Sequence, residues 1–146
     1  MSSIPVNDGP GTPHADAALL LIRIASALVF LFHGSGILFG MFGGPGPVQF
    51  AAEMQMPTIV GYLVGLAQVG GAIGILTGVL TRIGAACIFV VMLGAIFLVH
   101  LPHGFDSGKG GIEYPLTQLL IALALLSAGA GRYSLAGLLP PSLRKL

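Results

Sequence analysis

The sequence predicts an all-α membrane protein whose four transmembrane helices form an up-down-up-down bundle. Of its 146 residues, 55% are hydrophobic and only 8% are charged, and the mean hydropathy is +0.96. Soluble domains carry about a quarter charged residues, so this composition is not that of a water-exposed surface. Four apolar runs each come close to the roughly 20 residues that cross a bilayer core. We place these runs at 17–40, 58–79, 83–101 and 114–130.

The first run follows a polar segment, residues 1–16, which we expect to be flexible. This segment contains no Lys or Arg, so it lacks the basic region that opens a secretory signal peptide. The apolar run after it is also longer than a signal-peptide core. We therefore expect the first run to be a membrane helix. A single membrane domain spans residues 17–136, and residues 137–146 form a short cytoplasmic tail.

The connections between the runs differ in length and character. The turn at 79–83 (VLTRI) is so short that the second and third runs must be antiparallel neighbours. Residues 41–57 begin with glycines and prolines, but their later part, 48–56, has apolar residues at helical spacing and is predicted to lie on the membrane surface. Residues 102–113 are polar and glycine-rich. We expect the two longer loops to form a lid over one end of the bundle.

The distribution of cations predicts the orientation of the bundle. Arg82 lies in the short turn, and Arg132, Arg144 and Lys145 follow the last run. The first long loop has no Lys or Arg, and the second has only Lys109. Because positive residues are retained on the cytoplasmic side, both termini and the short turn are predicted to be cytoplasmic. The expected location is the cell (inner) membrane.

Glycines at every fourth residue predict close helix packing. Small residues at this spacing let membrane helices approach each other, which favours a compact bundle. The same faces favour binding to a partner protein or to further copies of this chain, a homo-oligomer. The glycines concerned are Gly36, Gly40 and Gly44; Gly61 and Gly65; and Gly70, Gly74 and Gly78.

The four runs each bring polar residues to the same half of the bundle. Polar side chains at membrane depth are costly, so they mark a candidate functional site by default. We infer a candidate pocket there and include Arg23 in it, although Arg23 also fits a side chain that snorkels toward the membrane surface. The other pocket candidates are His33, Gln68, His100, Glu113 and Tyr114.

Each of these residues also has a structural interpretation. His33 fits a hydrogen bond to a carbonyl of a neighbouring helix, and Gln68 fits a polar contact between helices. Glu113 fits a helix cap. His100 and His103 fit interfacial residues wetted by headgroup water. The joint arrangement is a stronger argument for a site than any residue alone.

Several chemistries are compatible with these side chains, and others are excluded. His33, His100 and His103 are candidate metal ligands, but no tight motif defines their geometry. A haem bound by two histidines is disfavoured because His33 and His100 differ in expected depth by about two turns. Dithiol chemistry is excluded because Cys87 is the only cysteine. A quinone pocket remains open, since a histidine and a carboxylate can exchange protons with a bound carbonyl group.

Other function classes lack their signatures. The sequence contains no phosphate-binding loop and no nucleophile elbow. It also has no basic cluster of the kind that binds nucleic acid. The lipid bilayer is therefore the one partner that the composition itself predicts.

Five stretches of sequence occur in an order that is typical of one family: LLIRIASALVFLFHGSGILFGMFGGPGP, GLAQVGGAIGILTGVLTRIGA, VHLPHGF, IEYPL and GAGRYSL. Over residues 18–136 the chain resembles the DoxX family of small four-span membrane proteins. The resemblance implies a four-helix bundle in the cytoplasmic or plasma membrane. It also implies a redox association, since some members are subunits of quinone-linked oxidoreductases acting on sulfur compounds and others accompany redox-stress systems. The positions that match family motifs are Arg23, His33, Gly34, Arg82, His100, Glu113 and Tyr114.

Three positions depart from that family pattern. This chain has Ile37 where the family often has lysine and Gln68 where it often has glutamate. If those two charges are partners elsewhere, losing both removes a buried ion pair without leaving a lone charge. His103 stands where asparagine is common and adds a third imidazole to this half of the bundle.

Three functions remain open on this basis. The first is a subunit or accessory of a membrane redox system, with a quinone or small-molecule pocket between His33, His100 and Glu113. The second is a non-catalytic membrane subunit whose glycine faces pack against other helices in a larger complex. The third is a metal-handling bundle that uses the histidines.

Overall fold

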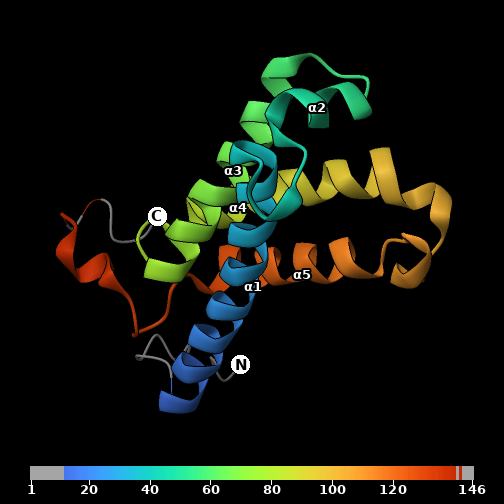
Figure 1. The fold of residues 1–146 in the computed structure, drawn as a ribbon. Coiled ribbons are helices and arrows are strands. Elements are labelled where there is room, and N and C mark those ends of the chain that lie inside the picture. Colours follow the sequence, from blue (N-terminus) through green and yellow to red (C-terminus); the bar gives the residue numbers. More distant parts are fainter. Residues whose placement is uncertain (1–11, 141, 143–146) are drawn as a thin grey trace.

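The computed structural model describes residues 12–140 and 142, and the regular secondary structure within them consists of helices without strands. Three elements are long and apolar enough to cross a membrane, Pro13–Phe39, Thr58–Thr77 and Thr81–His103, and Glu113–Ala128 is a shorter apolar helix. This confirms the predicted all-α membrane bundle. The α-helices in Figure 1 are α1 (Pro13–Phe39), α2 (Gly46–Glu53), α3 (Thr58–Thr77), α4 (Thr81–Ala95) and α5 (Glu113–Ala128).

Helix α1 begins earlier than the hydropathy predicts. Thr12 caps it, since its side-chain oxygen accepts a hydrogen bond from the N–H of Ala15 at 3.3 Å, and Pro13 occupies the first turn. The polar residues 13–16 that we expected to be flexible are therefore helical. Residues 1–11, and the tail cations Arg144 and Lys145, lie outside the described residues.

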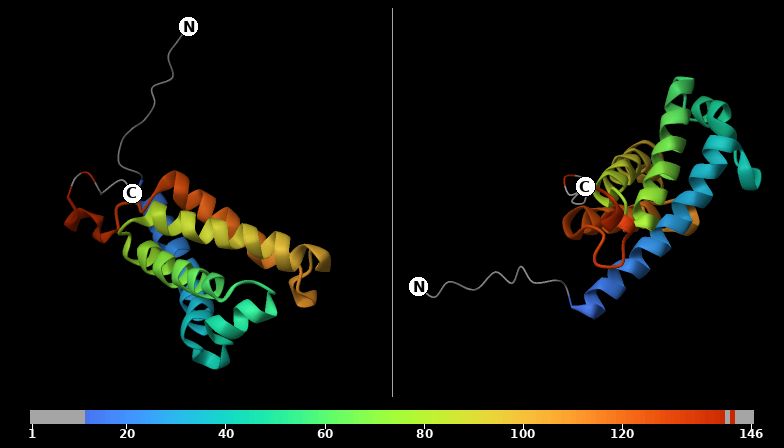
Figure 2. Two further views of the ribbon diagram at one scale, coloured as in Figure 1. Left: turned by 90° about the horizontal axis from the view of Figure 1, so that it is seen from above. Right: turned by 90° about the vertical axis from the view of Figure 1, so that its left-hand side faces the viewer.

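The helices pack as two antiparallel pairs that cross each other. The most extensive packing joins α1 to α3, α3 to α4, and α4 to α5, whereas α1 and α5 touch over a short stretch. Figure 2 shows α1 and α3 side by side in its right-hand view and α4 and α5 side by side in its left-hand view. The pairs are joined through the tight α3–α4 turn, as the short connection predicted. From that turn they diverge toward the two longer loops (Figure 1).

The glycines bring the helices of this chain into contact with one another. A Cβ atom on Gly84 of α4 would lie 2.6 Å from the carbonyl oxygen of Gly71 of α3. A Cβ on Gly34 of α1 would lie 2.8 Å from the Cβ of Gln68. Among the glycines of α3, Gly70 alone has open space where its Cβ would be. Most of these glycine faces therefore pack against other helices of this chain. Fewer of them are left for the partner contacts that we expected.

Arg23 is buried where the helices converge, with 1% of its surface exposed. The expectation that its side chain snorkels to the membrane surface is therefore wrong. The last carbonyls of a helix have no partner within the helix and carry the negative end of its dipole, and Arg23 supplies donors to two of them in α3. Its guanidinium donates from Nε to Ile75 O (2.7 Å), from Nη2 to Leu76 O (2.8 Å), and from Nη1 to Ala130 O (2.7 Å) and Tyr133 O (2.6 Å).

Asp16 holds the same segment from one end of α1. Its carboxylate is buried and accepts a hydrogen bond of 3.0 Å from the N–H of Arg132. Asp16 and Arg23 are seven residues apart, so they lie on one face of the helix. Together they attach the chain after α5 to the first half of α1. We call this end of the molecule, with the α3–α4 turn, the turn end, and the opposite end the loop end.

Candidate functional site

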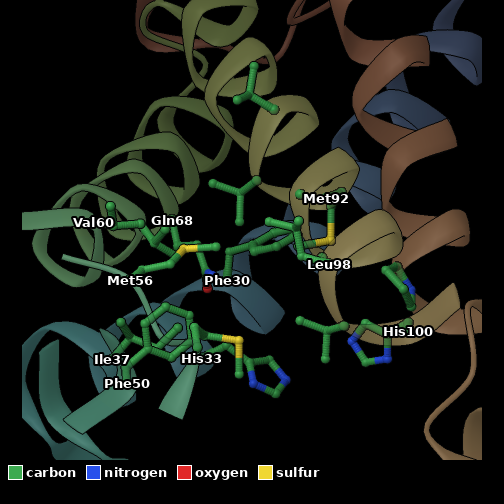
Figure 3. A pocket seen from close by; sticks show the side chains of 18 of the residues that line it. Phe30, His33, Ile37, Phe50, Met56, Val60, Gln68, Met92, Leu98 and His100 are labelled. Carbon is green, nitrogen blue, oxygen red and sulfur yellow. The ribbon is translucent and has the colours of Figure 1, made fainter. Parts of the chain in front are cut away.

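A cavity of about 500 Å³ lies between the two helix pairs toward the loop end. Every α-helix contributes to its wall, and most of the lining side chains are aliphatic, aromatic or methionine. Figure 3 shows Phe30 and Met92 on its inner side, with His33 and His100 at its edge. A pocket of this size and character accommodates a small organic molecule.

Four of the predicted site residues line this cavity, each from a different part of the chain. His33 comes from α1, Gln68 from α3, His100 from the helical segment that continues α4, and Tyr114 from the first turn of α5. The other two candidates lie elsewhere: Arg23 at the turn end, and Glu113 in contact with the loop before α5. The structure therefore brings together the polar residues that face one another across the diverging pairs.

Gln68 is the deepest polar group of the cavity. Its side chain is 5% exposed, and its Oε1 atom is buried without a hydrogen-bond partner among the described residues. A buried polar atom left unpaired costs about 1–3 kcal/mol. The expected role as a polar contact between helices is not seen for this oxygen. Figure 3 shows the Gln68 amide beside Phe30.

His33 stands at the edge of the cavity, and its side chain is exposed. The ring meets Phe32 edge-on, with centroids 5.3 Å apart, and lies tilted against Tyr114 at 5.9 Å. The described residues offer no hydrogen bond to the imidazole, so the carbonyl contact that we considered for it is not formed. Both ring nitrogens remain available to a ligand or to water.

His100 owes its position to a change in helix type. After Ala95 the helix widens into a π-helix, Ile96–His100, and then tightens into a 3₁₀ turn, Leu101–His103, that contains Pro102. Proline cannot continue an α-helical ladder, and π turns are frequent at functional sites. The Nδ1 atom of His100 lies 2.6 Å from the carbonyl oxygen of Gly110. If Nδ1 carries the proton and donates it there, the Nε2 atom of a neutral ring is an acceptor.

The remaining polar candidates stabilise the loop rather than line the cavity. His103 Nδ1 lies 3.0 Å from the carbonyl oxygen of Val99. The carboxylate of Glu113, which precedes the apolar part of α5, accepts a 3.1 Å hydrogen bond from the N–H of Ser107. This hydrogen bond holds the pKa of Glu113 below its usual value. Within residues 12–140 and 142 no three His, Cys, Asp or Glu side chains are grouped as metal ligands.

Sequence reasoning missed the contribution of the first loop to the cavity. The predicted helix in that loop exists as α2, and it packs on α3 and α1. Phe50 of α2, and Met54 and Met56 in the segment just after it, line the cavity. The sequence signal for this contribution is the four-residue spacing of Phe50 and Met54, which places two apolar side chains on one face of a helix. The second loop, expected to complete a lid, contributes no lining side chain between 101 and 112.

The two helix positions at which this chain departs from the family pattern also line this cavity. Ile37 and Gln68 come from α1 and α3, the two helices of one pair. The resemblance implies charged side chains at these positions in relatives, whereas here they are neutral. The cavity wall of this chain therefore has no charge from either position.

Comparison with known proteins supports the resemblance. The DoxX family profile matches residues 18–101. A Bacillus subtilis protein named "Putative oxidoreductase CatD" is 29% identical over 106 residues, which cover 73% of this chain and 76% of that protein. A Mycobacterium tuberculosis protein named "Uncharacterized membrane protein Rv3486" is 31% identical over 139 residues, which cover 86% of this chain and 85% of that protein. No solved structure is significantly similar. Since the profile spans more than half of the sequence, this chain belongs to the DoxX family.

Proposed function

We propose that this protein is a subunit or accessory of a membrane redox system and binds a quinone or similar small molecule in the cavity between its helix pairs. The observation that carries the proposal is the convergence of Gln68, His33 and His100 on one apolar cavity of about 500 Å³. An apolar pocket with a few convergent polar groups is the usual form of a small-molecule site. The name of the Bacillus subtilis relative, an oxidoreductase, agrees with this class of function.

The residues of this chain have distinct roles in that proposal. Reduction of a quinone consumes two electrons and two protons, and the electrons come from a partner subunit of the system. Histidine is the side chain that changes protonation most readily near neutral pH, so His33 and His100 are the proton-exchanging groups. In this proposal, the exposed ring of His33 at the edge of the cavity exchanges protons with water at the loop end. Gln68 and Tyr114 bind and orient the ring of the ligand.

We further propose that the turn end faces the cytoplasm and the loop end faces the periplasm or cell exterior. Arg82 and Arg132 are exposed at the turn end, as the positive-inside rule requires of the cytoplasmic side. In a Cys87→Ser background, a single cysteine introduced at Ser107 or at Ser142 reports which side of the membrane that position faces. A membrane-impermeant maleimide applied to whole cells should label the former and spare the latter. The opposite pattern would reverse the proposed topology.

The function is tested by purifying the protein in nanodiscs and analysing what remains bound. Solvent extraction and mass spectrometry should find a quinone, and added quinone should bind with saturable affinity. His33→Ala should weaken that binding, whereas His14→Ala, an exposed histidine in the first turn of α1, should not. Unchanged quinone binding in His33→Ala would remove His33 from the site. A protein that binds no quinone but co-purifies tightly with another membrane protein would favour the non-catalytic interpretation.

The same preparation addresses the remaining alternatives. Absorbance spectra report any haem, and elemental analysis reports any bound metal. His33 and His100 lie at the edge of the cavity, whereas the Nδ1 atom of His103 is 3.0 Å from the Val99 carbonyl oxygen within its own turn. Stoichiometric metal that is lost in both His33→Ala and His100→Ala would support a metal-handling function in place of the quinone pocket.

A further inference from the structure

A second hollow adjoins the cavity on the outer side of the seam between α3 and α4. It measures about 450 Å³ and is lined by Leu63, Val64, Ala67, Ala86, Cys87, Val90 and Val91. Val64, Val90 and Val91 line the cavity as well, so the two spaces share a wall. Leu63 and Val90, which are 57% and 65% exposed, face outward into what is hydrocarbon when the bundle lies in a membrane. The hollow is therefore an apolar space directly beside the site, on the side that faces hydrocarbon.

The polar end of the site is defined by one atom. Within the part of the chain that the structure describes, Gln68 Oε1 is a buried acceptor without a donor, in a side chain that is 5% exposed and lines the cavity. A ligand satisfies this atom only if it presents a donor, such as a hydroxyl group. A ligand that has acceptors alone leaves the atom unpaired or turns the amide over. Recognition of a hydroxyl by a buried polar group is strongly selective, because the analogue without the donor keeps the cost of the unpaired atom.

From these two observations we propose that the site takes a lipid-soluble molecule with a hydroxyl on its head and a hydrocarbon tail. The hydroxyl donates to Gln68 Oε1 inside the cavity, and the tail lies in the hollow between α3 and α4. The ligand enters sideways from the bilayer between Leu63 and Val90. This inference rests on the proposed function and specifies it, since the hydroxyl-bearing form of a quinone is its reduced form, the quinol.

The head is tested with matched probes that carry out no redox chemistry. The wild-type protein in nanodiscs is titrated with para-decylphenol and with the methyl ether of the same molecule. We expect the phenol to bind about tenfold more tightly, which corresponds to one unpaired buried acceptor. Gln68→Met should abolish this preference. Methionine keeps the unbranched stem whose Cβ packs over Gly34 and has no strong acceptor, so the helix contact is retained.

The tail is tested by filling the hollow without changing the cavity. Ala86 lines the hollow but not the cavity. Ala86→Phe should therefore weaken binding of para-decylphenol about tenfold and leave para-cresol, which lacks the tail, unaffected. Ile83→Phe is the matched control, since Ile83 is an exposed residue of α4 that lines neither space. Retained folding of each variant is checked by circular dichroism.

The outcomes separate this inference from the function on which it rests. A protein that binds a decyl-substituted benzoquinone but shows no preference for the phenol over its ether would overturn the inference and keep the proposed function. Equal effects of Ala86→Phe on the two phenols, or no effect on either, would overturn the placement of the tail. Failure to bind the quinone and every phenol probe would overturn both proposals.

Discussion

Arg23 and Ala130, 107 residues apart in the sequence, are joined by a hydrogen bond of 2.7 Å from Nη1 to the carbonyl oxygen. The same guanidinium holds the carbonyls of Ile75 and Leu76 at the end of α3. One side chain of α1 thus ties together the end of the second span and the segment after the last. The helix pairs are held here at the turn end, and they diverge around the cavity at the loop end.

Replacing Arg23 should destabilise the whole bundle. In Arg23→Lys, one ammonium cannot reach both pairs of carbonyls, so at least two buried acceptors lose their donor. At about 1–3 kcal/mol each, we expect a loss of roughly 2–6 kcal/mol in the free energy of unfolding. Thermal or denaturant unfolding in detergent, followed by circular dichroism, measures it. The control is Arg82→Lys, because Arg82 is exposed and makes one bond of 3.1 Å to Ser127 O. Equal effects of the two variants would contradict the role of Arg23.

Two adjacent glycines of α3 should respond oppositely to alanine. A Cβ on Gly71 would lie 2.9 Å from the carbonyl oxygen of Gly84, so Gly71→Ala should cost about 1–3 kcal/mol through overpacking. Gly70→Ala meets open space, and alanine favours the helix by up to about 1 kcal/mol, so this variant should be neutral or more stable. The melting temperatures of the two variants measure the difference. A destabilised Gly70→Ala would instead indicate that this face packs on another chain.

The buried hydroxyl of Ser26 and the amide of Gln118 should be energetically coupled. Ser26 Oγ donates to Gln118 Oε1 at 3.1 Å, and this bond links α1 to α5, which otherwise touch little. Hydrogen bonds between membrane helices contribute about 0.6 kcal/mol on average. A double-mutant cycle of Ser26→Ala and Gln118→Leu should return a coupling of that order. A coupling of zero would show that the link is not stabilising.

The carboxylate of Glu113 should make stability depend on acid pH. Its pKa is lowered in the folded protein by the hydrogen bond from the Ser107 N–H. A lowered folded-state pKa means that the contribution is complete above the unfolded-state value and is lost as the pH falls through the folded-state value. Carbon NMR titration of Glu113 should show a pKa below that of a free glutamate side chain. Glu113→Gln should flatten the acid limb of the melting temperature against pH, and an unchanged limb would contradict the assignment.

The fold could be predicted further from the sequence than the candidate site could. Span positions follow from local hydropathy, so the runs at 58–79 and 83–101 closely match α3 and the span Thr81–His103. The start of α1 was missed by a few residues, because the cap of Thr12 is polar and lies outside any hydropathy signal. Of the candidate residues, His33, Gln68, His100 and Tyr114 line one cavity, whereas Arg23 and Glu113 do not. The polar residues that each helix carries can be read from the sequence, but the sequence does not reveal which of their polar atoms find hydrogen-bond partners in the fold.

By itself, the sequence determined the class of protein, the number of apolar runs and the polar residues that they carry. Those properties depend on composition and on near neighbours in the chain. Only the tertiary structure decided that Arg23 is a buried donor to four carbonyls, that Gly71 meets Gly84, and that Gln68 Oε1 has no partner among the described residues. Each of these depends on where helices far apart in sequence cross. The crossing is decided by close packing at the turn end, and the divergence that follows from it creates the cavity.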